Sequence, residues 1–400
     1  MTKAKRIYVV GTCDTKGAEL NYAADLIAMA GGNCVVVDVS TTPGKFAADV
    51  SANHVANFHP GGVSAVLGLN DRGKAVTAMA EAFTKYILAQ DDVGAVLGMG
   101  GSGNSTIVTA GMRALPIGIP KLMVSTLASG NVASFVGASD ITMMHSVADV
   151  AGLNAISRQV IGNAAHAVVG MALNAVPQEA DAKLTVGVTM FGVTTECVSN
   201  IRQAIDESCE CFVFHATGTG GQCMEKLVDS GYLKALIDVT TTEVADHLFG
   251  GILPCTDDRF GSIIRTKVPY VGSVGAVDMV NFGPRETVPA KYSDRKFHIH
   301  NSSVTLMRTT AAENAAIGTW IVERLNQMAG PVRFLLPLRG VSAIDADGQI
   351  FADSKADEAL FSAIRLGWKQ APNRELVEVD GHINSSAFAD AVVHSFREIT

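Results

Sequence analysis

One glycine-rich stretch in the first half of the chain carries the residue types that suit the binding of an anion. It reads Val93-Gly-Ala-Val-Leu-Gly-Met-Gly-Gly-Ser-Gly-Asn-Ser-Thr106. Its apolar start predicts a buried parallel strand, and its polar end predicts a helix that begins near Gly103 or Asn104. Glycine lets a ligand approach the backbone closely, and the unpaired N–H groups at a helix start attract a phosphate. The predicted phosphate cradle consists of Gly100, Gly101, Ser102, Gly103, Asn104 and Ser105.

The spacing of these glycines fits known nucleotide motifs only in part. Gly98-x-Gly100-x-x-Gly103 matches the dinucleotide fingerprint, which also needs an acidic residue about 20 positions later. No Asp or Glu occurs between Asn104 and Ser139, and no Gly-Lys-Ser or Gly-Lys-Thr follows the glycines. A dinucleotide turn and a Walker loop are therefore disfavoured. A strand-to-helix turn in which glycine serves only packing stays open as the alternative.

Two further polar turns follow predicted strands of the first half and could line the same ligand. One follows the strand from Ile7 to Val10, and the other follows the strand from Leu122 to Val124. The candidate binding residues in these turns are Gly11, Thr12, Asp14, Thr15, Lys16, Ser125 and Thr126.

The second half supplies the candidates for acid–base chemistry and for holding a substrate. Histidine titrates near neutral pH, and guanidinium groups bind carboxylates in bidentate fashion. His298 and His300 alternate on a short strand and therefore share a face. The alternative to catalysis is a structural role. The histidines could serve only as hydrogen-bonding groups, and Glu313 could serve only to cap its helix with Thr310. The candidate catalytic residues are His215, Asp278, His300, Arg308 and Glu313, and the candidate substrate-binding residues are Gly218, Gly220, Gly221, Arg339 and His382.

Alternating strands and helices along the whole chain must position these residues. Such alternation predicts α/β architecture with parallel sheets. The segment 41–70 is expected to be an irregular lid or an oligomer contact, and 177–181 is the expected linker. Predicted strands cover 7–10, 34–39, 93–97, 122–124, 140–144, 184–189, 211–214 and 235–237, with more near Val271, Phe297, Phe334 and Leu376. Predicted helices include 16–29, 74–88, 154–175, 311–328, 355–366 and 385–396.

The turns of the two halves form a pattern that suggests duplication. Met99-Gly-Gly-Ser-Gly precedes Val124-Ser-Thr-Leu much as His215-Ala-Thr-Gly-Thr-Gly-Gly precedes Asp238-Val-Thr-Thr-Thr. We therefore predict two Rossmann-like, doubly wound domains, 1–178 and 182–400, with an extra unit in the first. Ligands of such sheets bind beyond the carboxyl ends of the strands, so a cleft between the domains is the expected site. The alternative is that all α/β units look alike.

Composition excludes several classes of protein. The chain has 400 residues, of which 48% are hydrophobic and 18% charged, and its net charge is -8. No basic stripe suited to nucleic acid occurs, and no apolar run reaches the length of a membrane span. The start of the chain does not resemble a signal peptide. The seven cysteines form no disulfide framework, so reduced thiols and a cytoplasmic location are expected.

Several motifs taken together resemble one family. They are Gly11-Thr-x-Asp14-Thr15-Lys16-Gly17, Gly100-Gly101-Ser102-Gly103, Ser146-Val-Ala-Asp149, His300-Asn301, Met307-Arg308-Thr309-Thr310 and His382-Ile-Asn384. The chain resembles, over nearly its full length, the ATP-binding domain family of the plant tobamovirus-resistance protein, which is widespread in bacteria. The resemblance implies two Rossmann-like subdomains, ATP binding and a homo-oligomer, as a dimer or tetramer.

Three functions are compatible with these residues and this resemblance. The first is an ATP-dependent enzyme that acts on a small carboxylate-bearing metabolite, with Lys16 beside the phosphates and Asp14 or Asp140 holding Mg²⁺. The second is a nucleotide-responsive binding or scaffold protein without turnover. The third is a lyase or hydrolase of a small acid that needs no nucleotide. Nicotinamide use ranks last, although Asp238 stands at a suitable distance after Gly218.

Overall fold

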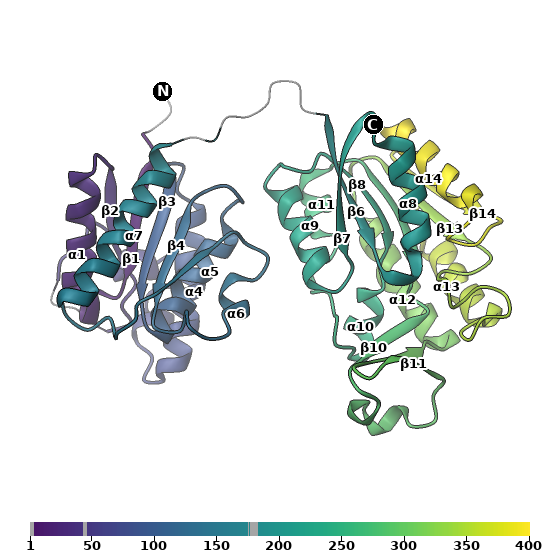
Figure 1. The fold of residues 1–400 in the computed structure, drawn as a ribbon, viewed down its shortest axis with the longest axis horizontal. Helices are drawn as coiled ribbons and strands as arrows, with labels where there is room; N and C mark the ends of the chain where they lie inside the picture. The colour runs from purple at the N-terminus through teal and green to yellow at the C-terminus, as the bar shows by residue number, and fades with distance from the viewer. Residues whose placement is uncertain (1–3, 43–45, 175, 177–182) are drawn as a thin grey trace. The chain divides into compact units, whose positions relative to one another are not determined.

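The chain forms two compact units, each with its own parallel sheet. The computed structural model describes residues 4–42, 46–174, 176 and 183–400. The units comprise residues 1–178 and 179–400, and Figure 1 shows each as a sheet with helices on both faces. The expected linker 177–181 lies outside the described residues. The predicted α/β class with two doubly wound domains is confirmed, whereas the cleft between the domains stays a prediction.

The first unit is a five-stranded parallel sheet in the order β2-β1-β3-β4-β5. Helices α1 and α7 pack on one face, and α4 and α5 pack on the other. Its strands are β1 (Arg6–Gly11), β2 (Cys34–Asp38), β3 (Val93–Gly100), β4 (Lys121–Ser125) and β5 (Thr142–His145). Its helices are α1 (Cys13–Met29), α2 (Ala52–Ala56), α3 (Ser64–Leu67), α4 (Arg72–Leu88), α5 (Ser102–Ala114), α6 (Ala133–Val136) and α7 (Ala155–Leu173).

Local sequence explains why these elements begin where they do. β3 is apolar along its length because both of its faces are covered. Asp71 caps α4 by accepting the N–H of Lys74 at 3.1 Å, and Asn154 and Ser157 form a capping box at the start of α7. The segment 41–70, expected to be irregular, contains the short helices α2 and α3.

The second unit contains a six-stranded parallel sheet and a small antiparallel sheet. Its strands are β6 (Leu184–Met190), β7 (Cys209–His215), β8 (Ala235–Thr240), β9 (Tyr270–Gly275), β10 (Met279–Phe282), β11 (Phe297–Asn301), β12 (Val304–Arg308), β13 (Val332–Pro337) and β14 (Arg374–Val379). Its α-helices are α8 (Thr195–Ile205), α9 (Thr219–Asp229), α10 (Glu243–Phe249), α11 (Gly261–Thr266), α12 (Ala311–Leu325), α13 (Ser354–Gly367) and α14 (Ser386–Ile399). Short 3₁₀ turns are η1 (Gly192–Thr194), η2 (Arg285–Thr287) and η3 (Ala290–Tyr292).

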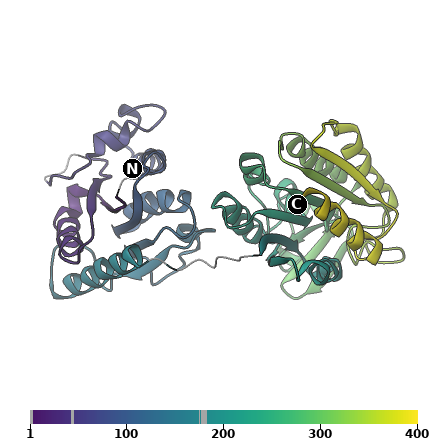
Figure 2. The same ribbon diagram turned by 90° about the horizontal axis from the view of Figure 1, so that it is seen from above.

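The large sheet of the second unit runs β14-β13-β9-β8-β6-β7, and the small one runs β10-β12-β11. Helices α8 and α14 pack on one face of the large sheet. The opposite face packs against α9 to α13, and Figures 1 and 2 show these two helical layers. The antiparallel β10-β12-β11 sheet was only partly predicted, because a strand was expected near Phe297 alone.

The strand orders support two related units but correct how their turns correspond. In each unit the first strand lies between the second and the third, so β1, β2 and β3 correspond to β6, β7 and β8. The turn after β3, at Gly100, therefore corresponds to the turn after β8. The predicted match with the turn at Gly218, which follows β7, is wrong, as is the extra unit in the first half. The opening turns at Gly11 and Gly192 do correspond.

Candidate functional site

The first unit has an open pocket at the point where its strand order reverses. β1 and β3 are neighbours in the sheet, and their connections leave in opposite directions, which creates a crevice at their carboxyl ends. A pocket of about 480 Å³ occupies this position, within the usual range for small-molecule sites. Its lining comprises Thr12, Asp14, Thr15, Lys16, Thr41, Thr42, Leu69, Asn70, Arg72, Ala75, Val76, Gly101, Ser102, Gly103, Asn104, Ile107 and Asp149.

The start of α5 presents unpaired backbone donors to this pocket. The first N–H bond within the helix runs from Ser105 to the carbonyl of Gly101 at 2.9 Å. No acceptor within the helix is therefore left for the N–H groups of Ser102, Gly103 and Asn104. The residue at the N-cap is Gly101, which has no side chain that could cap them. Together with the helix dipole, these donors form an anion site.

The two glycines before α5 have different surroundings. Gly100 has φ +146°, and a Cβ there would lie 2.6 Å from Nδ2 of Asn104, so only glycine fits without strain. At Gly101 the nearest atom to an added Cβ is Oγ1 of Thr126 at 3.7 Å. The protein itself therefore leaves room at Gly101, and a side chain there would project into space suited to a ligand.

Asn104 has a buried acceptor that no group of the described residues satisfies. Its side-chain Nδ2 donates to Oγ1 of Thr12 at 3.1 Å and to the carbonyl of Met99 at 3.0 Å. The residue is only 6% exposed, yet its Oδ1 has no hydrogen-bond partner in the part of the chain that the structure describes. Buried polar atoms are normally paired, so this atom fits the donor of a bound ligand or water.

A buried hydroxyl pair supports the cradle from below. Oγ of Ser105 and Oγ of Ser125 lie 2.7 Å apart, and both side chains are fully buried. The predicted binding residues Ser105 and Ser125 therefore join α5 to β4 and do not line the pocket. Thr126 lies beside Gly101, as its Oγ1 position shows.

The opening turn contributes side chains, whereas its first two helical N–H groups are already paired. The N–H of Cys13 donates to Oδ1 of Asp38 at 3.0 Å, and that of Asp14 donates to Oγ of Ser40 at 3.1 Å. The start of α1 is thus not a second anion site of the kind found at α5. Asp14 accepts a hydrogen bond from Oγ1 of Thr42 at 2.5 Å.

Charges of both signs surround the pocket. Lys16 and Arg72 supply positive charge, and Asp14 and Asp149 supply negative charge. Sequence reasoning missed five polar lining residues: Thr41, Thr42, Asn70, Arg72 and Asp149. The first four lie in or next to the segment predicted to be irregular. Asp149 ends the Ser-Val-Ala-Asp motif, which indicated the family but was not assigned to the site.

Asp140 does not belong to this site. It precedes β5 and pairs with Nζ of Lys121, the first residue of β4, at 2.6 Å. Asp14 instead follows the carboxyl end of β1. Because parallel strands share their direction, the two carboxylates lie at opposite ends of the strands. Of the two alternative Mg²⁺ ligands, only Asp14 therefore lines the pocket, and Mg²⁺ binding stays a prediction.

In the second unit, protein side chains fill the corresponding crevice. Oγ1 of Thr194 and Oγ1 of Thr240 lie 2.8 Å apart between the ends of β6 and β8. Both are fully buried. In the described residues, hydroxyl groups therefore occupy the place at which the crevice of the first unit is open.

The glycine turn after β7 is also packed against protein atoms. An added Cβ would lie 2.3 Å from the carbonyl of Pro254 at Gly218, and 2.1 Å from Oε1 of Glu243 at Gly221. At Gly220 it would overlap the carbonyl of His215. Glu243 accepts the N–H of Gly218 at 2.8 Å. These glycines serve packing, which argues against the predicted role in substrate binding.

One buried arginine behind this turn holds three carboxylates. Arg259 contacts Asp238 through two bonds of 2.8 Å, Glu225 at 2.9 Å and Glu243 at 2.5 Å. Burial raises the pKa of Glu225 and Glu243, although Arg259 lowers it in part. Both carboxylate oxygens of Asp238 accept hydrogen bonds from Arg259, so Asp238 is not positioned to bind a ribose.

Arg308 forms a second buried cluster and is not available to a substrate. Its guanidinium donates to Asp345 and Asp357 at 2.8 Å each and to the carbonyl of Phe351 at 2.7 Å. The residue is 4% exposed. Asp278 is fully buried nearby and accepts a hydrogen bond from Oγ of Ser342 at 2.8 Å. Burial raises the pKa of Asp278 to about 6. This packing argues against the predicted roles of Arg308 and Asp278.

The remaining predicted residues of the second unit are also engaged within the protein. Glu313 forms the capping box with Thr310 and pairs with Arg295 at 2.5 Å. Burial raises the pKa of Glu313, but the bonds from Arg295 outweigh it and hold the pKa below its usual value. Arg339 is exposed and pairs with Asp380 at 2.6 Å. Nε2 of His382 forms a hydrogen bond of 2.8 Å with the carbonyl oxygen of Ser342.

The two histidines proposed for proton transfer lie on different sheets. His215 ends β7 and stacks on Phe191, with 5.2 Å between the ring centroids. His300 lies on β11 of the small sheet, and its ring is 6.4 Å from that of His298, so the prediction of a shared face fits. Neither histidine lines the pocket between β1 and β3 of the first unit.

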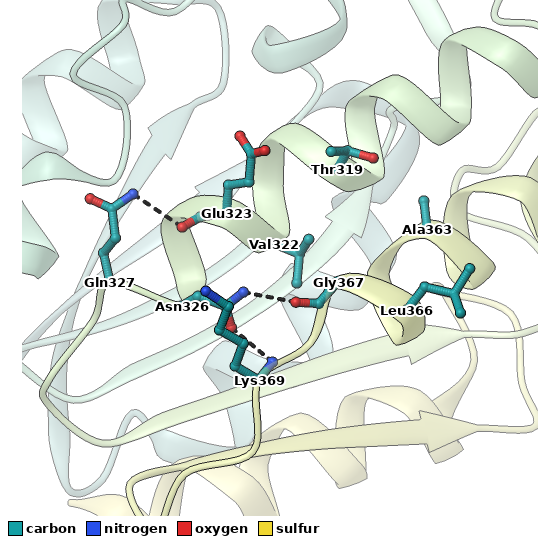
Figure 3. A pocket seen from close by; sticks show the side chains of 9 residues that line it. All are labelled: Thr319, Val322, Glu323, Asn326, Gln327, Ala363, Leu366, Gly367 and Lys369. Atoms are coloured by element: carbon teal, nitrogen blue, oxygen red, sulfur yellow. Dashed lines mark hydrogen bonds between the residues drawn. The ribbon is translucent and has the colours of Figure 1, made fainter.

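The second unit has a further hollow between α12 and α13, whose polar groups are used within the protein. Figure 3 shows Thr319, Val322 and Leu366 around it. Asn326 donates to the carbonyl of Gly367 at 2.8 Å and accepts the N–H of Lys369 at 3.0 Å. No set of converging catalytic groups lines this hollow among the described residues.

Two features are absent from the residues that the structure describes. No described helix combines the length and apolar character needed to cross a membrane. Within the same residues, no group of three or more His, Cys, Asp or Glu side chains could hold a metal ion.

Comparison with known proteins places the chain in a family of two-domain α/β proteins. Residues 5–177 match the N-terminal domain, and residues 183–400 the C-terminal domain, of the uncharacterised protein family UPF0261. The chain belongs to this family. A UPF0261 protein of Rhizobium meliloti is 55% identical over 395 residues, which are 99% of each chain. One of Mesorhizobium japonicum is 56% identical over 97% of this chain and 98% of its own.

The same comparison confirms the resemblance to the plant protein. The ToMV resistance protein Tm-1 of Solanum lycopersicum is 39% identical over the whole of this chain. The matched region is 56% of the length of the tomato protein. The chain thus spans about half of this plant relative and nearly all of the bacterial ones.

Proposed function

We propose that the first unit binds ATP in the pocket between β1 and β3, with the triphosphate at the start of α5. The observation that carries this proposal is the combination of three unpaired N–H groups, at Ser102, Gly103 and Asn104, with open space beside Gly101. Phosphate oxygens suit such donors. The family resemblance supports ATP as the particular nucleotide.

The rest of the pocket suits the other parts of a nucleotide with its metal ion. Lys16 and Arg72 would offset phosphate charge, and the apolar side chains of Val76 and Ile107 would contact a base. Mg²⁺ bound with the phosphates would find the carboxylates of Asp14 and Asp149 on the wall. The unpaired Oδ1 of Asn104 would accept a hydroxyl or a metal-bound water.

Binding without turnover is favoured over catalysis on a small acid. The residues expected to perform chemistry do not converge: Arg308 is buried among carboxylates, Glu313 is paired with Arg295, and His215 and His300 lie on different sheets. We therefore propose a nucleotide-binding or nucleotide-regulated protein of the cytoplasm. Turnover of a carboxylate-bearing metabolite remains the second candidate.

Replacement of Gly101 by valine tests the site. Gly101→Val places a branched side chain where the structure leaves room for phosphate, so ATP affinity measured by titration calorimetry should fall at least tenfold, about 1.4 kcal/mol. Gly170→Val is the matched control, because an added Cβ at this helical glycine meets no atom within 4 Å. Unchanged affinity in Gly101→Val, with a native circular dichroism spectrum, would rule out this pocket.

A further inference from the structure

The edge strand β7 has the sequence of an interior strand. Its residues are Cys-Glu-Cys-Phe-Val-Phe-His, so apolar side chains point to both faces, as in a strand covered by neighbours. Yet, among the described strands, β7 pairs only with β6 and ends the sheet. Phe212 and Val213 consequently remain 40% and 36% exposed.

The outer side of β7 offers unpaired backbone groups. The N–H of Ala216 donates to the carbonyl of Met190 in β6 at 2.8 Å. Successive residues of a strand direct their N–H groups to opposite sides. The N–H and carbonyl groups of Cys211 and Val213 therefore point away from β6, toward the open edge. The ladder with β6 runs through seven residue pairs without a register shift, so no bulge twists this edge away.

Other edges of the two parallel sheets are protected in ways that β7 is not. β14, at the opposite edge of the same sheet, carries Arg374, Glu375 and Glu378. β2 is covered by a bridge from Val50 to Val37, and β5 has only four residues. Native proteins block edge pairing by such devices. β7 has neither lysine nor proline, and Glu210 near its start is its one charged residue.

We propose that β7 pairs antiparallel with β7 of a second copy of this chain, with Val213 opposite Val213 of the partner subunit. This register brings together backbone groups that both point outward, as an antiparallel ladder requires. A two-fold axis through Val213 uses the same surface on both copies. The two six-stranded sheets then join into one continuous sheet.

Side-chain chemistry favours this register. Phe212 lies opposite Phe214 of the partner subunit, and the same pair occurs again on the other side of the axis, so four phenylalanine rings share one face. Aromatic cross-strand pairs of this kind stabilise sheets. Glu210 lies opposite Ala216 of the partner subunit, so no carboxylate faces another.

The first test removes the outward donor without disturbing the ladder to β6. Val213→Pro eliminates an N–H that points to the open edge, a position where proline is tolerated. Val213→Thr keeps that N–H and is the matched control. Sedimentation velocity of the full chain should show a dimer for the wild type and for Val213→Thr. Val213→Pro should dissociate at a concentration at least tenfold higher, with an unchanged circular dichroism spectrum.

The second test reads the register directly. Phe212→Cys and Phe214→Cys are prepared as separate variants and mixed under oxidation. A disulfide-linked dimer should form in the mixture and not in either variant alone, because residue 212 faces residue 214 of the partner subunit. A wild type that is monomeric at all concentrations, a Val213→Pro variant that remains fully dimeric, or crosslinking of Phe212→Cys alone would overturn the proposal.

Discussion

At the scale of single residues, the positive charge in the pocket of the first unit is available to a ligand. Lys16 and Arg72 line the pocket, and neither forms an ion pair among the described residues. Asp14 and Asp149 prevent the pocket from being strongly positive on its own. A nucleotide carried with a divalent cation matches this mixture of charges better than a bare anion does.

Arg72→Ala should weaken ATP binding by about tenfold, or about 1.4 kcal/mol, because a guanidinium next to phosphate makes charge-assisted hydrogen bonds. The salt dependence of the affinity should also decrease. Lys74→Ala is the matched control, because Lys74 lies on the same helix and carries the same charge but does not line this pocket. Equal losses in the two variants would indicate a general effect of charge and count against a contact with Arg72.

Arg308→Ala should lower the free energy of unfolding by about 3 to 5 kcal/mol, because it leaves buried aspartates without their counter-ion. Denaturation by urea measures the loss. Arg339→Ala is the comparison, because the Arg339–Asp380 pair is exposed. Loss of this pair should leave the midpoint of urea denaturation nearly unchanged. If the Arg308→Ala variant is as stable as the wild type, Arg308 has no structural role of this kind and again becomes a candidate for substrate binding.

Motifs identified the residues of the first unit better than those of the second. The cradle at α5 depends on backbone N–H groups and glycines that are adjacent in sequence, so local spacing contains the information. Arg308 instead donates hydrogen bonds to Asp345 and Asp357, which are far from it along the chain. Local spacing does not reveal such partners, and Arg308 therefore resembled an anchor for a ligand.

At the scale of elements, the order of strands decided which turn could be a site. The alternation of strands and helices predicted the parallel sheets correctly. The correspondence of turns depends on which strands are neighbours, and β7 lies at the edge whereas β3 is central. Two strands of similar sequence can occupy different places in a sheet, so the glycine turn at Gly218 looked equivalent to that at Gly100. Of the hairpin β11–β12, only β11 was predicted, from the strand expected near Phe297.

The Arg308 cluster ties β12 to α13 and to the loop after β13, and its protonation should make the stability of the second unit depend on pH. Burial, together with the neighbouring Asp278 and Asp357, raises the pKa of Asp345 to about 9. The folded state therefore holds a proton that the unfolded state releases above about pH 4. The stabilisation from this proton is present at low pH and is lost as the pH rises toward 9.

Asp345→Asn should flatten this dependence, because the amide resembles the protonated acid but does not titrate. Between about pH 6 and about pH 9, the free energy of unfolding should decline by about 4 kcal/mol less in Asp345→Asn than in the wild type. Asp380→Asn is the control. Asp345 and Asp380 line one hollow of the second unit, distinct from the hollow between α12 and α13, but Arg339 lowers the pKa of Asp380, so its titration falls below this range. Parallel pH profiles for Asp345→Asn and the wild type would contradict the assignment.

At the scale of the whole molecule, each unit has its own sheet and its own hydrophobic cores. The proposed nucleotide pocket is built from the first unit alone, and the Arg308 cluster from the second alone. Ligand binding and the mutation of one cluster should therefore act on different units. This separation can be tested on the intact chain.

Scanning calorimetry of the full chain should show two transitions, of which ATP with Mg²⁺ raises only one. A ligand at 100 times its Kd stabilises the unit that binds it by about 2.7 kcal/mol, which for a unit of this size corresponds to roughly 5 to 10 °C. Arg308→Ala identifies the other transition, because it should lower the melting temperature of the second unit and leave the transition that ATP raises in place. If ATP shifts the transition that Arg308→Ala lowers, the nucleotide binds the second unit, and the assignment of the pocket between β1 and β3 is wrong.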